Sequence, residues 1–190
     1  MRVETLVEKA RKLKEKGLST EEIADELNVS RETAMWLLTR ATEEPPSDIY
    51  VEWRNATKPS RLRFLAAALV DIINERIEEE IDVIVGVATS GIPLATMVAE
   101  ELGAELAIYY PRKFRVGEGG GVLSENFARV SGKNCVIVDD IISTGRTIKE
   151  AAEIVENSEG NVLCAVVIID KRGEAIDSIP VYSLMKVLRI

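Results

Sequence analysis

The chain has 190 residues, of which 46% are hydrophobic and 29% charged, a composition typical of a folded globular protein and not of a disordered one. No stretch approaches eighteen consecutive apolar residues, and the charged N-terminus lacks the apolar core of a secretory signal. We therefore expect a cytoplasmic protein with no membrane partner. The sequence contains no histidine, which excludes a histidine general base and metal sites built on histidine.

Charge is unevenly distributed along the chain, whose net charge is −8 at pH 7. Residues 1–42 carry eight Lys or Arg and eight Asp or Glu, so the whole acidic excess lies in residues 43–190. A neutral first part and an acidic second part indicate two modules with different partners.

The first forty residues predict three short helices. Apolar residues recur at helical spacing up to Gly17, which predicts the end of the first helix. Ser19–Glu22 has the pattern of a capping box, and Asn28-Val29 is the turn before a third helix that Ser30 caps. Two helices joined by so short a turn must cross at a steep angle, which is the geometry of a helix-turn-helix.

The segment 17–40 resembles a DNA-binding helix-turn-helix. It has a small residue, Ala24, where the two helices would touch, and an apolar Val29 in the turn. The candidates for contact with a DNA operator lie at the start of the third helix and are Ser30, Arg31, Glu32 and Thr33; Trp36 belongs either to this face or to the core. Because the module has no net positive charge, a structural three-helix cap or a dimerisation arm is the alternative.

A domain boundary is expected after the third helix. The consecutive prolines Pro45-Pro46 cannot continue a helix, because proline lacks the backbone donor and clashes with the preceding turn. We therefore predict a helix-turn-helix domain at 1–42, a linker at 43–48 and a second domain at 49–190.

The second domain has the pattern of an α/β fold. Ile49–Trp53 alternates like a short strand, and Ser60 is expected to cap a helix that extends to about Glu80. Apolar runs of the kind expected of strands buried on both faces of a parallel sheet occupy 81–89, 105–110, 134–142 and 161–170. Predicted helices at about 92–102 and 147–157 alternate with them, which predicts an open, right-handed, doubly wound parallel sheet. Cys135 and Cys164 lie in two of the runs, and we expect buried, reduced thiols.

The most specific feature of the sequence lies at the end of the run 134–142. Asp139 and Asp140 end an apolar strand, and a loop rich in hydroxyl groups leads into a helix. Such a loop offers backbone N–H groups and hydroxyls to an anion, and adjacent carboxylates suit the two hydroxyls of a ribose, directly or through Mg²⁺. The loop residues are Ser143, Thr144, Gly145, Arg146 and Thr147. The alternative is an ordinary connection from strand to helix in which Asp140 is a cap.

From Asp139 to Thr147 the sequence resembles the phosphoribosyl-pyrophosphate (PRPP) motif of type I phosphoribosyltransferases, and the resemblance extends over about 47–190. It implies that the two aspartates face the ribose 2′- and 3′-hydroxyls, that the loop binds the 5′-phosphate, and that Mg²⁺ accompanies PRPP. Thr89, Ser90 and Gly91 resemble the pyrophosphate loop of the orotate branch. This resemblance implies that their amides face the pyrophosphate at a helix N-terminus, with a non-proline cis peptide bond.

The same resemblance implies a mobile lid and a base pocket. The lid is Tyr110–Lys113 followed by Gly117–Gly121, and in an active enzyme Arg112 and Lys113 would act in catalysis with the two aspartates. Lys171 and Arg172 follow the last predicted strand, where the family recognises its base. Ser90 replaces the lysine of the orotate enzymes, and the lid is about two residues shorter than theirs. These departures indicate a domain that binds a ribose phosphate without efficient catalysis, since the transition state needs cations over the departing pyrophosphate.

A helix-turn-helix joined to a phosphoribosyltransferase-like domain resembles the archaeal GfcR-type transcriptional regulators. The resemblance implies a homodimeric, DNA-binding regulator whose second domain senses PRPP or a related phosphorylated metabolite in the control of sugar or nucleotide metabolism. The alternative is an active phosphoribosyltransferase for orotate or a purine, with the three helices as an accessory cap.

Overall fold

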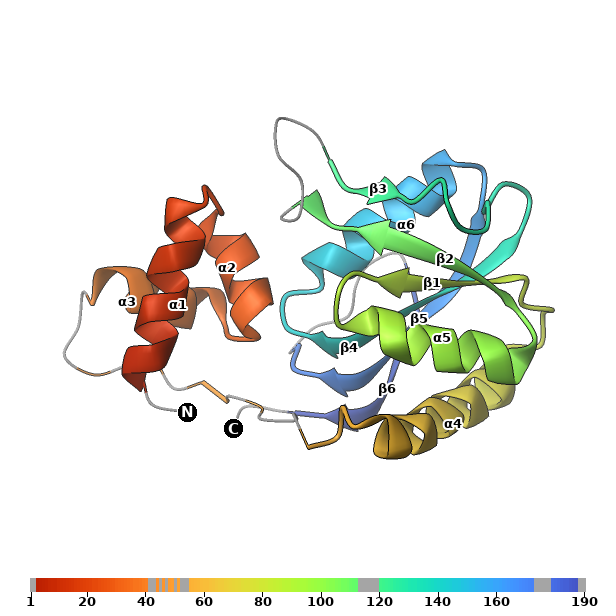
Figure 1. Cartoon of the computed structure of the whole chain (residues 1–190), viewed down its shortest axis with the longest axis horizontal. Coiled ribbons are helices and arrows are strands. Elements are labelled where there is room, and N and C mark those ends of the chain that lie inside the picture. Colours follow the sequence, from red (N-terminus) through yellow and green to blue (C-terminus); the bar gives the residue numbers. More distant parts are fainter. Residues whose placement is uncertain are drawn as a thin grey trace. The chain divides into compact units, whose positions relative to one another are not determined.

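The computed structural model describes residues 3–40, 44, 46, 48–49, 51, 55–112, 120–172 and 179–187. The chain divides into two compact units, one built on residues 1–52 and the other on residues 53–188. The first unit contains the helices α1 (Val3–Glu15), α2 (Thr20–Leu27) and α3 (Arg31–Thr39), at the positions that the sequence predicts (Figure 1). In the described part of the chain, no helix has the length and apolar character needed to cross a membrane.

Local hydrogen bonds define the ends of the three N-terminal helices. Ser19 Oγ accepts a hydrogen bond from the Glu22 amide at 3.2 Å, while Glu22 Oε2 accepts one from the Ser19 amide at 2.8 Å, which confirms the predicted capping box. Asn28 ends α2 in the left-handed conformation with φ of 53°, which its short polar side chain tolerates better than most. Ser30 Oγ accepts a hydrogen bond from the Thr33 amide at 3.1 Å and so caps α3.

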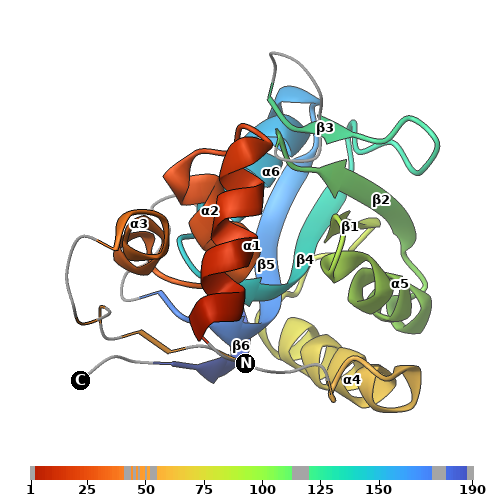
Figure 2. The same cartoon turned by 60° about the vertical axis from the view of Figure 1, so that its left-hand side comes forward.

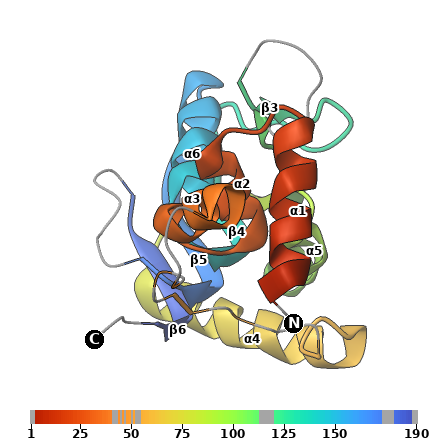
Figure 3. The same cartoon turned by 90° about the vertical axis from the view of Figure 1, so that its left-hand side faces the viewer.

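A small apolar core holds these helices together. Its buried residues are Val7, Ala10, Leu18, Ile23, Ala24, Leu27, Val29, Ala34, Trp36 and Leu37. Trp36 is 5% exposed and therefore belongs to the core, with the Arg40 guanidinium 4.2 Å from the centroid of its ring. Helices α1 and α3 run in clearly different directions (Figures 2 and 3), so α3 lies across the pair that α1 and α2 form.

The second unit is a six-stranded sheet with helices on both faces. The strand order is β3-β2-β1-β4-β5-β6, and every neighbouring pair is parallel except β2 with β3. The strands are β1 (Val83–Val87), β2 (Glu105–Tyr110), β3 (Val122–Leu123), β4 (Asn134–Ile142), β5 (Asn161–Asp170) and β6 (Val181–Lys186). Helices α4 (Pro59–Arg76) and α5 (Gly91–Leu102) cover one face and α6 (Arg146–Asn157) the other (Figure 1). The α/β fold predicted from the sequence is confirmed.

Several details differ from the prediction. Ser60 does not cap α4, which begins at Pro59 because proline suits the first helical position, and the helix ends at Arg76 instead of about Glu80. The strand predicted at 49–53 is wrong for its described residues, Ile49 and Val51, which belong to no strand. The sheet is not wholly parallel, because β3 is an antiparallel edge strand, and neither β3 nor β6 was predicted.

Both cysteines lie in the interior of the sheet, as predicted. Cys135 on β4 and Cys164 on β5 are fully buried and free. Burial raises the pKa of Cys164 to about 12, and burial with the Asp82 carboxylate nearby raises the pKa of Cys135 to about 11. Both thiols are therefore protonated at neutral pH and serve as small apolar side chains.

The strand order creates a topological switch point between β1 and β4. From β1 the chain passes through α5 to β2 on one side, whereas β4 pairs with β1 on the other side. Open α/β sheets bind ligands at such a point, outside the carboxyl ends of the strands. Gly91 brings α5 against β4 here, since a Cβ at this position would lie 2.7 Å from the Val138 carbonyl oxygen and 3.0 Å from Asp139 Oδ1.

Gly91→Ala is expected to lower the free energy of unfolding by about 1–3 kcal/mol, because the added methyl group overpacks a contact made largely with backbone. Urea denaturation of the full chain measures this change. Gly120→Ala is the matched control, because a Cβ at Gly120 would have no neighbour within 4 Å. Equal unfolding free energies for the two variants would contradict the close approach of α5 to β4.

Candidate functional site

The predicted ligand residues meet at the carboxyl ends of three adjacent strands. Asp139 and Asp140, near the end of β4, are 7% and 5% exposed. Thr89 and Ser90 follow β1, on one side of β4, and the Ala88–Thr89 peptide bond is cis, as the resemblance implied. On the other side, the Lys171 amide after β5 donates a hydrogen bond to the Ile142 carbonyl at 2.9 Å. The loop after β1 and the residues after β5 are more than eighty positions apart in the sequence, yet they lie at the same edge of the sheet.

Asp140 joins the loop after β1 to the end of β4. Its Oδ1 accepts hydrogen bonds from Ser90 Oγ at 3.0 Å and from the Ile141 amide at 2.8 Å. Within the described residues, its Oδ2 accepts none. The neighbouring Asp139 Oδ1 accepts a hydrogen bond from the Asp140 amide at 2.8 Å. Two nearly buried carboxylates therefore stand at the switch point, and one of them keeps an acceptor oxygen for an outside donor.

The loop between β4 and α6 contains a buried hydroxyl group without a partner. Ser143 Oγ is inaccessible to solvent and makes no hydrogen bond in the described part of the chain. Two residues later Gly145 adopts φ of 82°, and the Arg146 amide donates to Thr144 Oγ1 at 3.3 Å as α6 begins. An unsatisfied buried hydroxyl is costly, so its presence beside a helix N-terminus indicates a site for an anion.

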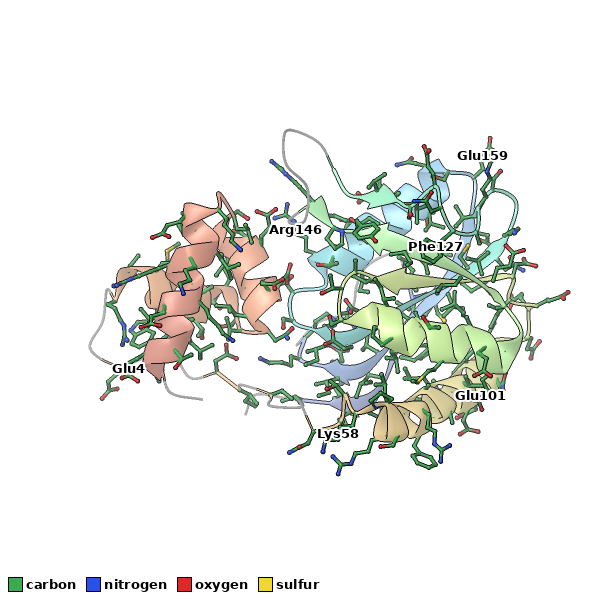
Figure 4. All side chains as sticks on the ribbon, in the orientation of Figure 1. Glu4, Lys58, Glu101, Phe127, Arg146 and Glu159 are labelled. Carbon is green, nitrogen blue, oxygen red and sulfur yellow. The ribbon has the colours of Figure 1, made fainter. Side chains whose placement is uncertain are left out.

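Arg146, one of the predicted loop residues, begins α6, where Figure 4 labels it. Its Nε donates to Glu150 Oε1 at 2.8 Å, and Tyr109 Oη donates to Glu150 Oε2 at 3.4 Å. Burial and the Glu150 carboxylate raise the pKa of the Tyr109 hydroxyl well above its usual value. The sequence analysis missed Glu150, although a glutamate four residues after an arginine is a recognisable helical ion pair.

A cavity of about 490 Å³ opens beside this ion pair. It is lined by Arg112, Gly120, Gly121, Arg146, Glu150, Glu153 and Ile154. Arg112 and Gly120 are described residues of the predicted lid, and they line this cavity together with Arg146 of the predicted phosphate loop. Lys113 and Gly117–Gly119, which the resemblance assigned to the lid, lie outside the described residues.

Arg172, a predicted base-pocket residue, is anchored by a buried ion pair. Its Nε and Nη2 lie 3.0 Å from Oδ1 and 2.8 Å from Oδ2 of Asp170, and both side chains are more than nine-tenths buried. Its Nη1 is buried and has no hydrogen-bond partner among the described residues. Asp170 therefore holds the guanidinium in a fixed orientation and leaves one nitrogen to donate elsewhere. Lys171 is half-buried beside it.

The four candidates for DNA contact have different environments in the first unit. Ser30 caps α3, and Thr33 is 8% exposed, so neither side chain is open to a partner. Arg31 and Glu32 are exposed, and Arg31 Nε lies 2.7 Å from Glu21 Oε1. Their role in DNA binding stays a prediction.

Comparison with known proteins identifies relatives over the whole chain. Residues 54–188 match the family model of the phosphoribosyl transferase domain. The chain is 66% identical over 193 residues to the transcriptional regulator GfcR of Archaeoglobus fulgidus, covering 100% of this chain and 99% of that protein. It is 46% identical over 200 residues to the protein of the same name from Methanosarcina mazei, covering 99% and 98%.

Solved structures agree on the fold of the second unit. Adenine phosphoribosyltransferase from Saccharomyces cerevisiae, in complex with an imino-altritol bisphosphate and adenine, has a TM-score of 0.60 and 25% identity, covering 74% of this chain and 88% of that one. Orotate phosphoribosyltransferase from Aeropyrum pernix has a TM-score of 0.57 and 23% identity, covering 77% and 83%. The chain belongs to the GfcR family of transcriptional regulators, and its residues 54–188 form a phosphoribosyl transferase domain.

Proposed function

We propose that this protein is a DNA-binding transcriptional regulator whose phosphoribosyl transferase domain binds PRPP or a related ribose phosphate, and that occupancy of this domain changes the affinity of the N-terminal helices for an operator. The regulated genes would serve sugar or nucleotide metabolism. The observation that supports ligand binding by this domain is the unpartnered hydroxyl of Ser143. A phosphate oxygen is an acceptor that would satisfy it, and the N-terminus of α6 favours the same negative charge.

The residues around Ser143 fit the rest of a ribose phosphate. Thr144, Gly145 and Thr147 would contact the 5′-phosphate with Ser143, and Asp139 and Asp140 would accept hydrogen bonds from the ribose hydroxyls. The loop at Thr89, Ser90 and Gly91 would face a pyrophosphate from the N-terminus of α5. A yeast relative of the same fold binds a sugar-like bisphosphate, which supports this ligand class.

Mg²⁺ would accompany a pyrophosphate ligand in this site. Among the described residues, no group of three or more acidic or cysteine side chains is arranged to hold a metal ion. Mg²⁺ does not need such a group, since it commonly takes one or two carboxylates together with phosphate oxygens of the ligand. Asp139 and Asp140 are the carboxylates that would contribute, and the ion would neutralise charge on the phosphates.

The proposal that the protein regulates transcription by binding DNA rests on the first unit and on the relatives. Three helices, two of them N-capped by a serine, with a tight turn at Asn28-Val29 have the form of a helix-turn-helix, and homologues over the full length are named transcriptional regulators. A homodimer would place two such units on half-sites about 34–36 Å apart. Catalysis is not part of the proposal, because Ser90 presents a neutral hydroxyl that donates to Asp140.

Ser143→Ala is expected to weaken PRPP binding about tenfold to a hundredfold, because a hydrogen bond to a charged group contributes about 1.5–3 kcal/mol. The same change should leave the stability of the ligand-free protein unchanged or raised, since it removes an unsatisfied hydroxyl. Isothermal titration calorimetry with Mg²⁺ and thermal unfolding measure the two effects. Ser158→Ala, at the far end of α6, is the control and should bind normally. Normal PRPP affinity in Ser143→Ala would exclude a phosphate at this hydroxyl.

The double variant Asp139→Asn with Asp140→Asn is expected to lose binding of both PRPP and ribose 5-phosphate while the protein stays folded. Asparagine keeps the shape of each side chain and removes its charge, so ribose hydroxyls and Mg²⁺ lose their acceptors. Calorimetry measures binding, and circular dichroism checks the fold. Asp71→Asn is the control, because it removes one carboxylate charge from the exposed side of α4, away from the site. Retained affinity in the folded double variant would refute the assignment of the aspartates.

Binding of the full chain to DNA is expected to depend on the ligand. A mobility-shift assay on promoter fragments, at several concentrations of PRPP and ribose 5-phosphate with Mg²⁺, should show a specific complex whose affinity changes with one of them. No specific complex under any condition, at micromolar protein and low salt, would refute the regulator. Release of pyrophosphate from PRPP with orotate or a purine at about 1–10³ s⁻¹ would instead indicate a working transferase.

A further inference from the structure

Residues 1–42 of the N-terminal unit are neutral in sum, but their charges are unevenly distributed among the helices. From Lys9 to Lys16 the second half of α1 and its end carry five basic residues and one acidic residue. Helix α2 carries four acidic residues and no basic one. DNA presents a dense row of phosphates. This unit therefore gains electrostatic affinity for DNA only where its basic residues face the duplex.

Two carboxylates lie beside the start of α3. Arg31, the cation in its first turn, is paired with Glu21 of α2 at 2.7 Å. The Ser30 amide donates to Asp48 Oδ2 at 2.5 Å, so a carboxylate already occupies the first backbone donor of the helix. A DNA phosphate at this end of α3 would meet two carboxylates at close range, which disfavours the contact.

Beyond its first turn, α3 adjoins cations of α1. A hollow of about 500 Å³ lies between these helices, and its lining includes Arg11, Lys14 and Glu15 from α1 with Met35 and Thr39 from α3. Met35 is 44% exposed, and Thr39 lies one helical turn further along the same exposed face. Figure 3 shows α1 and α3 within this unit. The hollow beside these exposed side chains of α3 therefore carries two positive charges and one negative charge, and its sum is positive.

We propose that the N-terminal unit docks on DNA through the side formed by α1 and the second half of α3, with Arg11 and Lys14 on backbone phosphates and Met35 and Thr39 towards base edges. This proposal rests on the DNA-binding function proposed above and assigns it a surface. The apolar Met35 suits the methyl group of a thymine, and the Thr39 hydroxyl suits a polar base edge in the major groove. The first turn of α3 then serves to fix the helix on its unit and does not contact the duplex.

The test compares two double variants of the full chain in a DNA-binding titration over a range of salt concentrations. Arg11→Ala with Lys14→Ala removes the two cations beside α3. Lys12→Ala with Lys16→Ala is the matched control, because it removes the same charge from positions about 100° and 140° around the helix from Arg11. Thermal unfolding of both variants checks the fold, and Arg11→Ala alone is a milder version, since Lys14 Nζ also donates to the Leu18 carbonyl.

Arg11→Ala with Lys14→Ala is expected to weaken binding to all DNA sequences. The slope of log affinity against log salt should become smaller in magnitude by about two, because each lost phosphate contact reduces that slope by about 0.9. The control should keep the original slope. Equal slopes for the first double variant and the unaltered protein, or an equal loss in the control, would overturn this surface while leaving the DNA-binding function intact. Failure of the unaltered protein to bind DNA would instead overturn the proposed function itself.

Discussion

The hydrogen bond from Ser90 Oγ to Asp140 Oδ1 joins the loop after β1 to the end of β4, at the edge of the sheet where the ligand site is proposed. The loop after β1 and the loop after β4 leave the sheet in opposite directions at the switch point. The bond forms because Gly91 has no side chain, so α5 can begin in contact with the backbone of β4. A bulkier residue at 91 would separate the loops and with them the two helix N-termini that favour an anion.

The same bond gives a physical reason for the departure at position 90 from the orotate phosphoribosyltransferases. A hydroxyl group at this place satisfies a nearly buried carboxylate without adding charge, which stabilises the site in its ligand-free form. Transfer of a phosphoribosyl group requires positive charge over the leaving pyrophosphate. A site with the proposed ribose- and phosphate-binding residues and a neutral hydroxyl at position 90 would suit the proposed sensor, which must bind its ligand and release it unchanged.

The N-terminal unit shows that net charge is a poor guide to a binding surface. The charges of residues 1–42 cancel in sum, yet five of the eight basic residues lie between Lys9 and Lys16 and four of the eight acidic residues lie in α2. Glu21 and Asp48 both contact the start of α3. Local potential, and not the total, determines where a polyanion approaches. A unit without net positive charge also binds DNA only weakly without specific contacts, which leaves room for a ligand or a second protomer to control its affinity.

The sequence by itself determined the local features: the caps at Ser19 and Ser30, the turn at Asn28, four of the six strands, and the string from Asp139 to Thr147, because each depends on neighbouring residues alone. It did not reveal β3 and β6, whose short or edge positions leave little periodicity to read. Only the tertiary structure decided that Asp140 meets Ser90 and that Arg11 and Met35 line one hollow. These contacts join distant segments, and strand order and helix packing bring them together.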